Sequence, residues 1–524
     1  MSQRSSSKAL TLALAQSAAG IIFGWGNSEG SGLFSMTSYQ RRFGECDAAG
    51  ICALSTTRQS AITGLLSVGA VIGAVGSGSI AARFGLRKTC IAFILIHLIG
   101  AAIETSAMNT YAQILVARLL TGLGIGATSG LVPVFQAEAS PPKYRGLVTG
   151  SFQLCVTLGI WGVSMTNWGM SRYDNSDISW RIPVALQMVF SACLLVGFIL
   201  SPESPRFLAK QERWEECRKN LANLRGLPED DANIDVEMDE VRAAAEKDKE
   251  RGSAKYSECF STQDRIAWRT MIGILVQIGQ QVTGINFFFS YGVQFAQAAG
   301  LANTYVFQII LASVNVAASF PGVIAVDRAG RRPVLLTGAA TMFIGQIVVG
   351  SVSKAYPDNP IAGDVLIAFT CLFVAAFASS WGPVAWVVCG ETFPIRLSSL
   401  CVTLGTGANW LFNLIIAFAA PQIQARIGTG ICFVWAGCLA LAFAFAFFCI
   451  PETKGMSIEE VDALYLSGTP AWRSGSFKRQ QEEQAIKSHE KHYARSTHRE
   501  GGAQVPKDSQ PSSAMTSARP SMDV

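Results

Sequence analysis

The fragment RFGLRK at residues 83–88 returns in altered form as DRAGRRP at residues 327–333, so that Arg83 and Arg328 stand 245 positions apart. Two more charged motifs recur at a similar offset: EASPPKYRG (138–146) returns as ETFPIRLSS (391–399), and PESPR (202–206) returns as PETKG (451–455). Three charged motifs that repeat at one period predict that the chain consists of two related halves.

The composition indicates where these halves reside. Of the 524 residues, 50% are hydrophobic and only 15% are charged. Apolar runs of roughly 20 residues, the length that crosses a bilayer as a helix, recur about twelve times between residues 10 and 450. Most runs lack the polar face that a buried helix of a soluble protein would show. The sequence therefore predicts an all-α membrane protein with about twelve transmembrane helices in two pseudo-symmetric six-helix bundles.

Two soluble segments divide the chain into four parts. Residues 202–268 are rich in charged residues and alanine, and residues 451–524 become rich in Ser, Gln, Lys and Pro. We expect an N-terminal bundle at 1–201, a cytoplasmic helical linker at 202–268, a C-terminal bundle at 269–450 and a largely disordered cytoplasmic tail at 451–524.

Basic residues indicate the orientation in the membrane. They concentrate in alternate loops, in the linker and in the tail, which places these segments and both termini in the cytoplasm by the positive-inside rule. Arg41, Arg42 and Arg58 lie in the first outer loop, so the rule holds on balance only. No clear cleavage site follows the first apolar run, which we interpret as a retained helix. The net charge of +5 is modest and predicts no nucleic-acid partner.

Most of the 13 cysteines lie inside apolar runs, where thiols behave as small hydrophobic groups. Cys46 and Cys52 lie close together in the first outer loop, where an oxidising environment permits a disulfide. Spacing alone does not establish a bond, and two free thiols are favoured. No group of Cys and His residues has metal-site spacing, so neither a metal nor a cofactor is expected.

The motifs, taken in order, resemble the major facilitator superfamily and, within it, the sugar porters. The motifs that carry the resemblance are RLLTGLGIG (118–126), PVFQAEASPPKYRG (133–146), PESPR (202–206), QQVTGIN (280–286), DRAGRRP (327–333), WGPVAWVVCGETFP (381–394) and PETKG (451–455). Each motif is weak alone, whereas their order over nearly everything before the tail is specific. The outer loop RRFGECDAAGIC (41–52) and the tail are most similar to fungal members, which are often hexose carriers.

The resemblance implies a substrate site built from amides and aromatic rings. The positions that match sugar contacts of the family are Gln153, Gln280, Gln281, Asn286, Asn315, Trp386 and Asn409, with Trp410 as a further lining aromatic. Amides suit a sugar because they donate and accept hydrogen bonds, as hydroxyls do. Amides within membrane helices are expected to face the bundle interior. Gln280 and Asn286 lie far apart around a straight helix, so a loosening at Gly284 is predicted between them.

Some of these amides have an alternative role, which is to join helices to one another. This alternative applies least to Gln281 and Asn286, and most to Asn315 and Gln153. The resemblance is also incomplete at one position, because some relatives carry a carboxylate where this chain has Ala378. A sugar contact from that position is expected to be lost, or to be supplied by a neighbour such as Ser380.

Charged clusters in the cytoplasmic loops form a second candidate site. The resemblance implies ion-pair networks that hold helix ends together in one of a carrier's two conformations. Close sequence range suggests three pairs: Glu138 with Arg145, Glu391 with Arg396, and Asp327 beside Arg328. The complete set of candidate gating charges is Arg83, Arg87, Glu138, Arg145, Glu203, Asp327, Arg328, Arg332, Glu391 and Arg396. Topology-setting charge is the alternative for some of the arginines, but carboxylates contribute little to orientation.

Two departures from the family pattern occur in the first-half cluster. Ala82 replaces a usual Asp, and Leu86 replaces a usual Arg. The ion-pair network of the first half is therefore predicted to be weaker than the network around Asp327.

The first apolar run contains FGWGNSEGSG (23–32), which departs from the family pattern. Sugar porters typically carry a carboxylate at the fourth position, where this chain has Gly26. In proton-coupled members that carboxylate is a candidate proton carrier, paired with the arginine that matches Arg118. Its absence favours a facilitator. However, Glu29 lies about one turn further on and on roughly the same helix face, so it is predicted either to bind a proton beside Arg118 or to be a structural partner of Arg118.

The sequence therefore predicts a carrier that moves a monosaccharide, first of all a hexose, by alternating access, with facilitated diffusion favoured over proton symport. A plasma-membrane location is expected, with the sugar and the lipid bilayer as partners, and with protons and cytoplasmic regulators of the tail as further candidates. A non-transporting sugar sensor that signals through the tail is the alternative function. An enzyme is disfavoured because the sequence offers no nucleophile–base pairing, metal spacing or phosphate loop.

Overall fold

The computed structural model describes residues 3–47, 52–108, 110–139, 145–251, 255–301, 303–356, 360–393, 395–456, 458–475 and 477. Contacts divide the chain into two units, Met1–Trp472 and Arg473–Val524. The first unit holds the helical bundle, and nearly all of the second unit lies outside the described residues.

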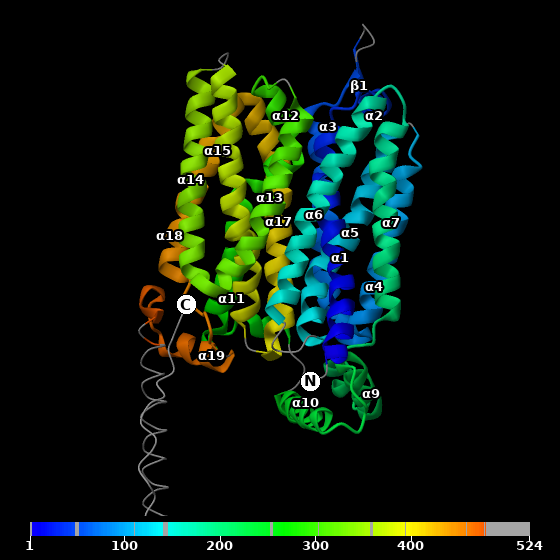
Figure 1. Cartoon of the computed structure of the whole chain (residues 1–524), viewed down its shortest axis with the longest axis vertical. Coiled ribbons are helices and arrows are strands. Elements are labelled where there is room, and N and C mark those ends of the chain that lie inside the picture. The colour runs from blue at the N-terminus through cyan, green and yellow to red at the C-terminus, as the bar shows by residue number, and fades with distance from the viewer. Residues whose placement is uncertain are drawn as a thin grey trace, which may run out of the picture. The chain divides into compact units, whose positions relative to one another are not determined.

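Six long helices form the first half of the bundle (Figure 1): α1 (Gln3–Leu33), α3 (Thr56–Phe84), α4 (Leu86–Thr105), α5 (Tyr111–Ala139), α6 (Arg145–Met170) and α7 (Ile178–Leu200). Between the first two lie the short helix α2 (Thr37–Phe43) and two antiparallel strands, β1 (Glu45–Cys46) and β2 (Cys52–Ala53). We call the end of the bundle that carries these strands the hairpin end.

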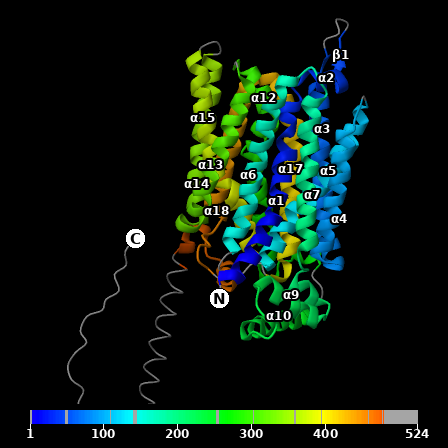
Figure 2. The ribbon, with the colours of Figure 1, turned by 45° about the vertical axis from the view of Figure 1, so that its right-hand side comes forward.

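Six further crossings form the second half, and two of them are broken helices. The unbroken ones are α13 (Thr304–Ala329), α14 (Arg331–Ala355), α17 (Ile395–Ile427) and α18 (Ile431–Cys449). The broken ones are the pair α11 (Ile266–Val282) and α12 (Ile285–Ala298), and the pair α15 (Pro360–Ser379) and α16 (Trp381–Glu391). Figure 2 shows from a second direction that the long helices of both halves run in the same general direction.

Short helices lie at the opposite end of the bundle, which we call the linker end (Figure 1). They are α8 (Pro205–Lys210), α9 (Trp214–Arg225) and α10 (Ala232–Arg251), followed by a 3₁₀ turn at Tyr256–Phe260 and, after the last crossing, α19 (Ile458–Ser467). Helices α8 to α10 bury a small core of their own around Leu208, Cys217 and Met238. Helices α8 to α10 therefore pack on one another in the segment that follows the first half.

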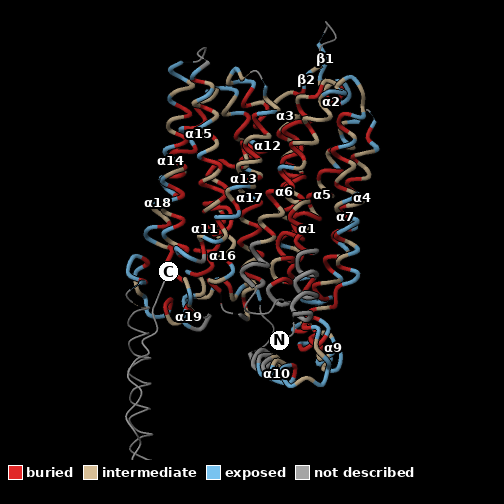
Figure 3. The backbone as a smooth tube through the Cα atoms, viewed as in Figure 1, coloured by how far each residue is buried: buried red, intermediate tan, exposed pale blue. Residues whose placement is uncertain are grey.

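Length and apolarity agree with membrane crossings. Among the described residues, nine helical segments are long and apolar enough to span a bilayer, and one of these, Arg396–Cys449, contains both α17 and α18. Large apolar side chains such as Ile72, Val196 and Leu441 remain exposed on the outer faces of these helices. Figure 3 shows buried residues along the interior of the same helices. An apolar exterior around a packed interior is the arrangement expected of helices surrounded by lipid.

The repeat seen in the sequence has a structural counterpart at the linker end. Gly85 joins α3 to α4 with φ +97°, and Gly330 joins α13 to α14 with φ +99°, a backbone conformation that glycine adopts most readily. A Cβ on Gly85 would lie 2.5 Å from Glu203 Oε2, and a Cβ on Gly330 would lie 2.5 Å from Glu452 Oε2. Each turn therefore requires glycine for two reasons. Its φ is positive, and the neighbouring carboxylate leaves no room for a Cβ atom.

Those two carboxylates hold the starts of the following helices. Glu203 Oε1 accepts a hydrogen bond from the backbone N of Arg87 at 3.0 Å. Glu452 accepts from the backbone N of Arg331 at 3.0 Å and of Arg332 at 3.1 Å. A carboxylate at a helix N-terminus satisfies free N–H groups and complements the helix dipole. The equivalent contacts in the two halves show the pseudo-symmetry that the repeated motifs predicted.

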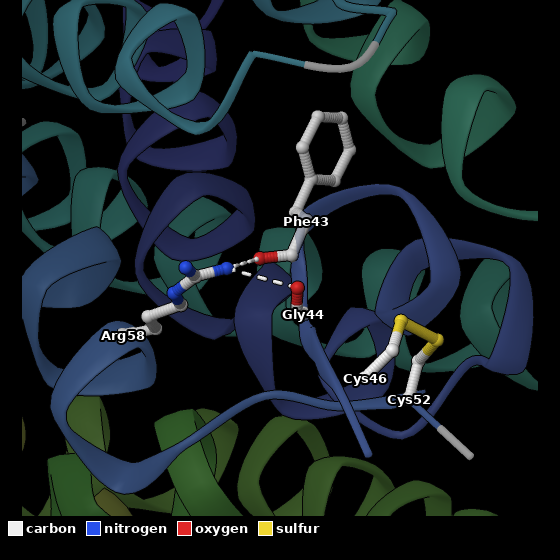
Figure 4. Close-up of a disulfide and its surroundings, with 5 residues drawn as sticks. All are labelled: Phe43, Gly44, Cys46, Cys52 and Arg58. Atoms are coloured by element: carbon white, nitrogen blue, oxygen red, sulfur yellow. Dashed lines mark hydrogen bonds between the residues drawn. A yellow bond between two sulfur atoms is a disulfide. The ribbon is translucent and has the colours of Figure 1, made fainter. Parts of the chain in front are cut away.

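The hairpin corrects one prediction. Cys46 and Cys52 pair in the β1–β2 register and form a disulfide, so the expectation of two free thiols was wrong (Figure 4). The physical reason is that the strands bring the two residues face to face, which the sequence spacing did not reveal. Arg58 supports the loop by donating to the carbonyls of Phe43 at 2.6 Å and Gly44 at 2.9 Å.

Candidate functional site

The break between α11 and α12 creates the centre of the candidate site. Gly284 has φ +86°, and a Cβ there would meet the ring of Trp435 at 2.6 Å. The helix therefore stops at Val282 and restarts at Ile285. Across this break, Asn286 Nδ2 donates to Gln281 Oε1 at 2.5 Å. The predicted loosening at Gly284 is present, and it brings two predicted amides into direct contact.

A cluster of amides extends from this point to α17. Gln281 Nε2 donates to Asn409 Oδ1 at 2.6 Å. Asn409 Nδ2 in turn donates to Gln277 Oε1 and to Gln280 Oε1, each at 2.8 Å. Asn409 is 1% exposed and Gln281 is 2% exposed, so these bonds form away from solvent. We call Gln277, Gln280, Gln281, Asn286 and Asn409 the amide cluster.

Gln280 also serves the alternative role foreseen for some amides. Its Nε2 donates to the carbonyl oxygens of Trp381 at 3.1 Å and Gly382 at 2.8 Å, at the start of α16. These carbonyls lie in the first turn of α16, just after the break between α15 and α16, and a carbonyl oxygen has a second lone pair with which it can accept from a side chain. Gln280 therefore joins the two broken crossings of the second half.

The first half contributes residues that the sequence reading did not single out. Asn27 on α1 donates through Nδ2 to Asn286 Oδ1 and accepts through Oδ1 from Asn413 Nδ2, both at 3.4 Å. Ser67 on α3 donates to Asn413 Oδ1 at 2.8 Å. Asn413 lies one helical turn beyond Asn409 on α17, and this i, i+4 spacing was the signal available in the sequence. Asn27 thus connects the amide cluster to the first half of the bundle, and Asn27 and Ser67 both connect Asn413 to it.

Two further predicted site residues, Gln153 and Trp410, lie where the two halves meet. A Cβ on Gly382 would lie 3.5 Å from Gln153 Nε2, which brings α6 of the first half against α16. Trp410 is fully buried, donates from Nε1 to Ser129 Oγ at 3.1 Å, and meets the Phe23 ring edge-on at 5.0 Å. Trp410 therefore contacts two helices of the first half.

Three further positions are placed less centrally. Trp386 lies half-buried on α16. Asn315 is buried on α13, and its Oδ1 accepts no hydrogen bond among the described residues. Ser380, the suggested replacement for the carboxylate missing at Ala378, donates to Ala376 O at 2.5 Å and lies against Gly338 of α14. Its hydroxyl therefore bonds to the backbone of α15 and lies against α14.

A second buried polar group lies wholly within the first half. Arg118 Nη2 lies 3.1 Å from Glu29 Oε2, and Arg118 Nε lies 2.8 Å from Glu104 Oε1. Arg118 also donates to Gly26 O at 3.3 Å, and Gln187 Nε2 donates to Glu29 Oε2 at 2.6 Å. Glu29 and Glu104 are fully buried and Arg118 is 3% exposed. The predicted contact between Glu29 and Arg118 is present, whereas Glu104 was missed although it is an isolated carboxylate within an apolar run.

At the linker end the structure changes one predicted pairing. Glu391 accepts from Arg331 Nη2 at 2.7 Å and Nε at 3.1 Å, and from Thr453 Oγ1 at 2.8 Å. Arg396 pairs instead with Glu258 in the 3₁₀ turn after the linker, and this hydrogen bond holds the pKa of Glu258 below its ordinary value. The predicted Glu391–Arg396 pair is thus wrong, because α16 ends at Glu391 and the chain turns before α17 begins.

The other candidate gating charges have varied surroundings. Arg87 donates to the carbonyls of Phe198 and Ile199, and Arg332 donates to that of Phe447. Arg83 lies over the ring of Phe84, and the carbonyl of Arg328 accepts from Lys454. The side chains of Glu138, Arg145 and Asp327 lie outside the described residues. The predicted difference in strength between the two networks therefore stays a prediction.

Glu391→Ala is expected to lower the free energy of unfolding by about 2–3 kcal/mol, because it leaves the largely buried Arg331 without its bidentate carboxylate. The midpoint of thermal unfolding in detergent measures this loss. Glu216→Ala is the matched control, since its pair with Arg213 is about half exposed and contributes less than ~1 kcal/mol. Equal shifts for the two variants would contradict a specific role for Glu391.

The two halves also meet along a seam of hydrogen bonds toward the hairpin end. Beyond Asn27, Ser31 Oγ accepts from the backbone N of Val293 at 3.2 Å, and Ser31 O accepts from Gln294 Nε2 at 3.1 Å. Gln294 Nε2 also donates to Ser35 Oγ at 3.1 Å. We call this contact between α1 and α12 the α1–α12 seam.

Comparisons with known proteins agree with this arrangement. A family model described as "Sugar (and other) transporter" matches residues 12–465. The hexose transporter HXT10 of Saccharomyces cerevisiae is 34% identical over 466 residues, which cover 87% of this chain and 85% of that protein. Hexose transporter 2 of Kluyveromyces lactis is 33% identical over 468 residues, with 87% and 82% covered.

Solved structures of a xylose transporter share the fold. The proton:xylose symporter XylE bound to 6-bromo-6-deoxy-D-glucose superposes with a TM-score of 0.73 at 22% identity, over 88% of this chain and 99% of that one. The inward open conformation of the xylose transporter XylE from E. coli gives a TM-score of 0.68 at 23% identity, with 87% and 99% covered. At these identities the likeness shows the fold alone.

Proposed function

This chain belongs to the sugar transporter family, and we propose that it carries a hexose across a membrane by alternating access. The predicted major facilitator fold is confirmed, and the chain is a multi-pass integral membrane protein rather than an enzyme. The observation that carries the proposal is the amide cluster, which lies at the break between α11 and α12 and is linked by Asn27 to the opposite half.

The chemistry of the cluster fits a hexose. A sugar hydroxyl both donates and accepts hydrogen bonds, and an amide offers two donors and an acceptor. Buried amides that are already oriented by one another lose little conformational freedom when a sugar arrives, which favours binding. Gln281, Asn286 and Asn409 are proposed as the central contacts, with Gln153, Gln280 and Asn315 around them and Trp386 and Trp410 as apolar walls.

In the proposed mechanism the hairpin end and the linker end of the bundle open in turn. The α1–α12 seam joins the two halves at the hairpin end. At the linker end, the Glu391–Arg331 pair holds helices of the second half together, and the Arg396–Glu258 pair connects α17 to the 3₁₀ turn after the linker. A carrier needs only that the contacts at one end weaken while those at the other form. The lobes that move are proposed to be residues 1–201 and 269–450.

The positions of the arginines and of the disulfide indicate how the protein is oriented in the membrane. Arg87, Arg331 and Arg332 lie at the linker end, and the disulfide lies at the hairpin end. Because positive residues favour the cytoplasm and disulfides persist outside it, the hairpin end is proposed to face outward. The linker, the tail and both termini then lie in the cytoplasm, and the plasma membrane is the proposed location.

Facilitated diffusion is the proposed mode, because Gly26 lacks the carboxylate of proton-coupled relatives. Proton symport is the second candidate, and the contact of Arg118 with both Glu29 and Glu104 favours it. Two buried carboxylates beside one guanidinium leave an excess negative charge that a proton would neutralise. Glu29→Gln separates these modes: loss of pH-dependent uptake in the variant supports symport, whereas uptake by the parent protein that is independent of pH excludes it.

Uptake of radiolabelled glucose in a transporter-deficient cell tests the proposed function. The carrier is expected to bring label into the cell, and unlabelled hexoses are expected to compete more strongly than polyols or disaccharides. A sugar sensor that signals through the tail would bind the label without accumulating it. Such binding at the cell surface with no entry would overturn transport and support the sensor.

A further inference from the structure

Asn27 occupies an unusual position among the buried amides. It lies on α1 of the first half, but its amide partners, Asn286 and Asn413, both belong to the second half. Its backbone carbonyl also accepts from Ser290 Oγ of α12 at 2.9 Å. Three bonds therefore connect this one residue to the opposite half of the bundle.

The lengths of these bonds separate Asn27 from the amide cluster. Within the cluster, the side-chain amide bonds of Gln281 are 2.5 and 2.6 Å long, whereas both side-chain bonds of Asn27 are 3.4 Å long. Amide hydrogen bonds weaken as they lengthen beyond about 3.0 Å. The cluster is therefore held tightly within one lobe, and its connection to Asn27 is the part that breaks most readily.

Asn27 is also continuous with the α1–α12 seam. Ser31 follows it four residues later on the same face of α1. Ser35 lies in the turn just after α1 ends at Leu33 and accepts from Gln294 of α12. The bonds of Asn27 and those that close the hairpin end therefore join the same two segments of the chain.

We propose that Asn27 is a positioning residue that takes the place of the sugar at Asn286, and so holds the hairpin end of the unloaded carrier closed. The proposal rests on the proposed transport function. When a sugar is bound, its hydroxyls engage Asn286 and close the two lobes around themselves. When the carrier is unloaded, Asn27 supplies the missing bonds from α1.

This role has different consequences for different kinds of flux. Exchange of labelled for unlabelled sugar uses only loaded carriers, so it does not depend on Asn27. Net uptake and net efflux each require the unloaded carrier to reorient, in opposite directions. Removing the Asn27 side chain destabilises the unloaded form whose hairpin end is closed. The unloaded carrier then returns to the outward-open form faster, and it changes from outward-open to closed more slowly.

Asn27→Leu tests the proposal, because leucine has a similar size and makes no side-chain hydrogen bond. Uptake, efflux and equilibrium exchange of a labelled, non-metabolised glucose analogue are measured in transporter-deficient cells. The ratio of maximal uptake to maximal efflux is expected to rise by about fivefold, the effect of losing roughly one net hydrogen bond from a single state. Exchange is expected to change by less than about twofold, as the loaded forms keep their bonds.

Two further variants make the result specific. Ser28→Ala is the matched control on the same helix, since Ser28 Oγ is buried and makes no hydrogen bond among the described residues. The ratio of maximal uptake to maximal efflux of Ser28→Ala is expected to equal that of the parent protein. Ser290→Ala removes the hydroxyl that donates to Asn27 O, and should shift the ratio in the same direction even if Asn27→Leu fails to reach the membrane.

An unchanged or lowered ratio in both Asn27→Leu and Ser290→Ala would overturn the proposal. So would a parallel loss of uptake, efflux and exchange, which would make Asn27 an ordinary contact of the loaded site. Absence of all three fluxes in the parent protein is a different result, because it refutes the proposed transport function itself.

Discussion

Gln281→Ala is expected to reduce the uptake rate at low sugar concentration by about 100-fold, because one polar atom on each of two neighbouring amides loses its partner, at a cost of about 1–3 kcal/mol each. Asn409 Oδ1 loses a donor at 2.6 Å, and Asn286 Nδ2 loses an acceptor at 2.5 Å. The two partners also lose their mutual orientation at the Gly284 break. Initial rates of labelled glucose uptake, normalised to protein at the cell surface, measure the effect.

Gln346→Ala provides the control for this experiment. Gln346 is also a buried glutamine of the second half, 1% exposed on α14, but its side chain has no hydrogen-bond partner among the described residues. Its replacement removes the same number of atoms without disturbing the amide cluster, and uptake is expected to stay within about twofold of the parent protein. Similar losses in the two variants would mean that Gln281 acts through packing alone.

Arg118→Leu is expected to destabilise the folded protein by about 3–5 kcal/mol, because it leaves buried carboxylates without their cation. Glu29 and Glu104 both lose their ion pair, and neither side chain reaches solvent. The remaining donor to Glu29 is the neutral amide of Gln187 at 2.6 Å. The midpoint of thermal unfolding in detergent, together with the yield of monodisperse protein, measures the loss.

Neutralising the carboxylates is expected to reverse this effect. The triple variant Arg118→Leu, Glu29→Gln, Glu104→Gln contains no buried charge at this position, and replacing a complete ion-pair group is often close to neutral. Its unfolding midpoint should therefore recover most of the difference between Arg118→Leu and the parent protein. A triple variant as unstable as Arg118→Leu would show that the guanidinium contributes packing rather than charge balance.

Sequence patterns predicted the fold and the helix break at the centre of the candidate site because both are marked by short patterns. Apolar runs of bilayer length and the repeated charged motifs led to two related bundles, and Gly85 and Gly330 occupy equivalent turns in them. The helix period indicated that Gln280 and Asn286 need a break between them, and Gly284 provides it. Each of these patterns is short and can be recognised in a single sequence, and the repeat required only that such patterns be compared along the chain.

Contacts between distant segments were harder to predict. Glu104 is 14 residues from Arg118 and on a different helix, and nothing local marks it as a second partner of the same guanidinium. Asn27 and Asn413 are separated by 386 positions, so their contact depends on how the two halves pack. A single sequence does not encode such pairs in any readable period.

Closeness in sequence also proved misleading at two places. Glu391 and Arg396 are five positions apart, yet the turn between α16 and α17 directs them to Arg331 and Glu258. Cys46 and Cys52 were expected to remain free, yet a two-stranded hairpin brings them together. In both cases the direction of the backbone, rather than the number of intervening residues, decides which side chains meet.

Counterflow in proteoliposomes would test most directly whether this protein transports sugar. Purified protein is reconstituted into vesicles loaded with unlabelled glucose, and labelled glucose is added outside. A carrier that faces each compartment in turn must exchange the two, so we expect label to accumulate transiently inside above its external concentration and then to decline. Label that binds in proportion to protein but never exceeds the external concentration inside would contradict transport by alternating access.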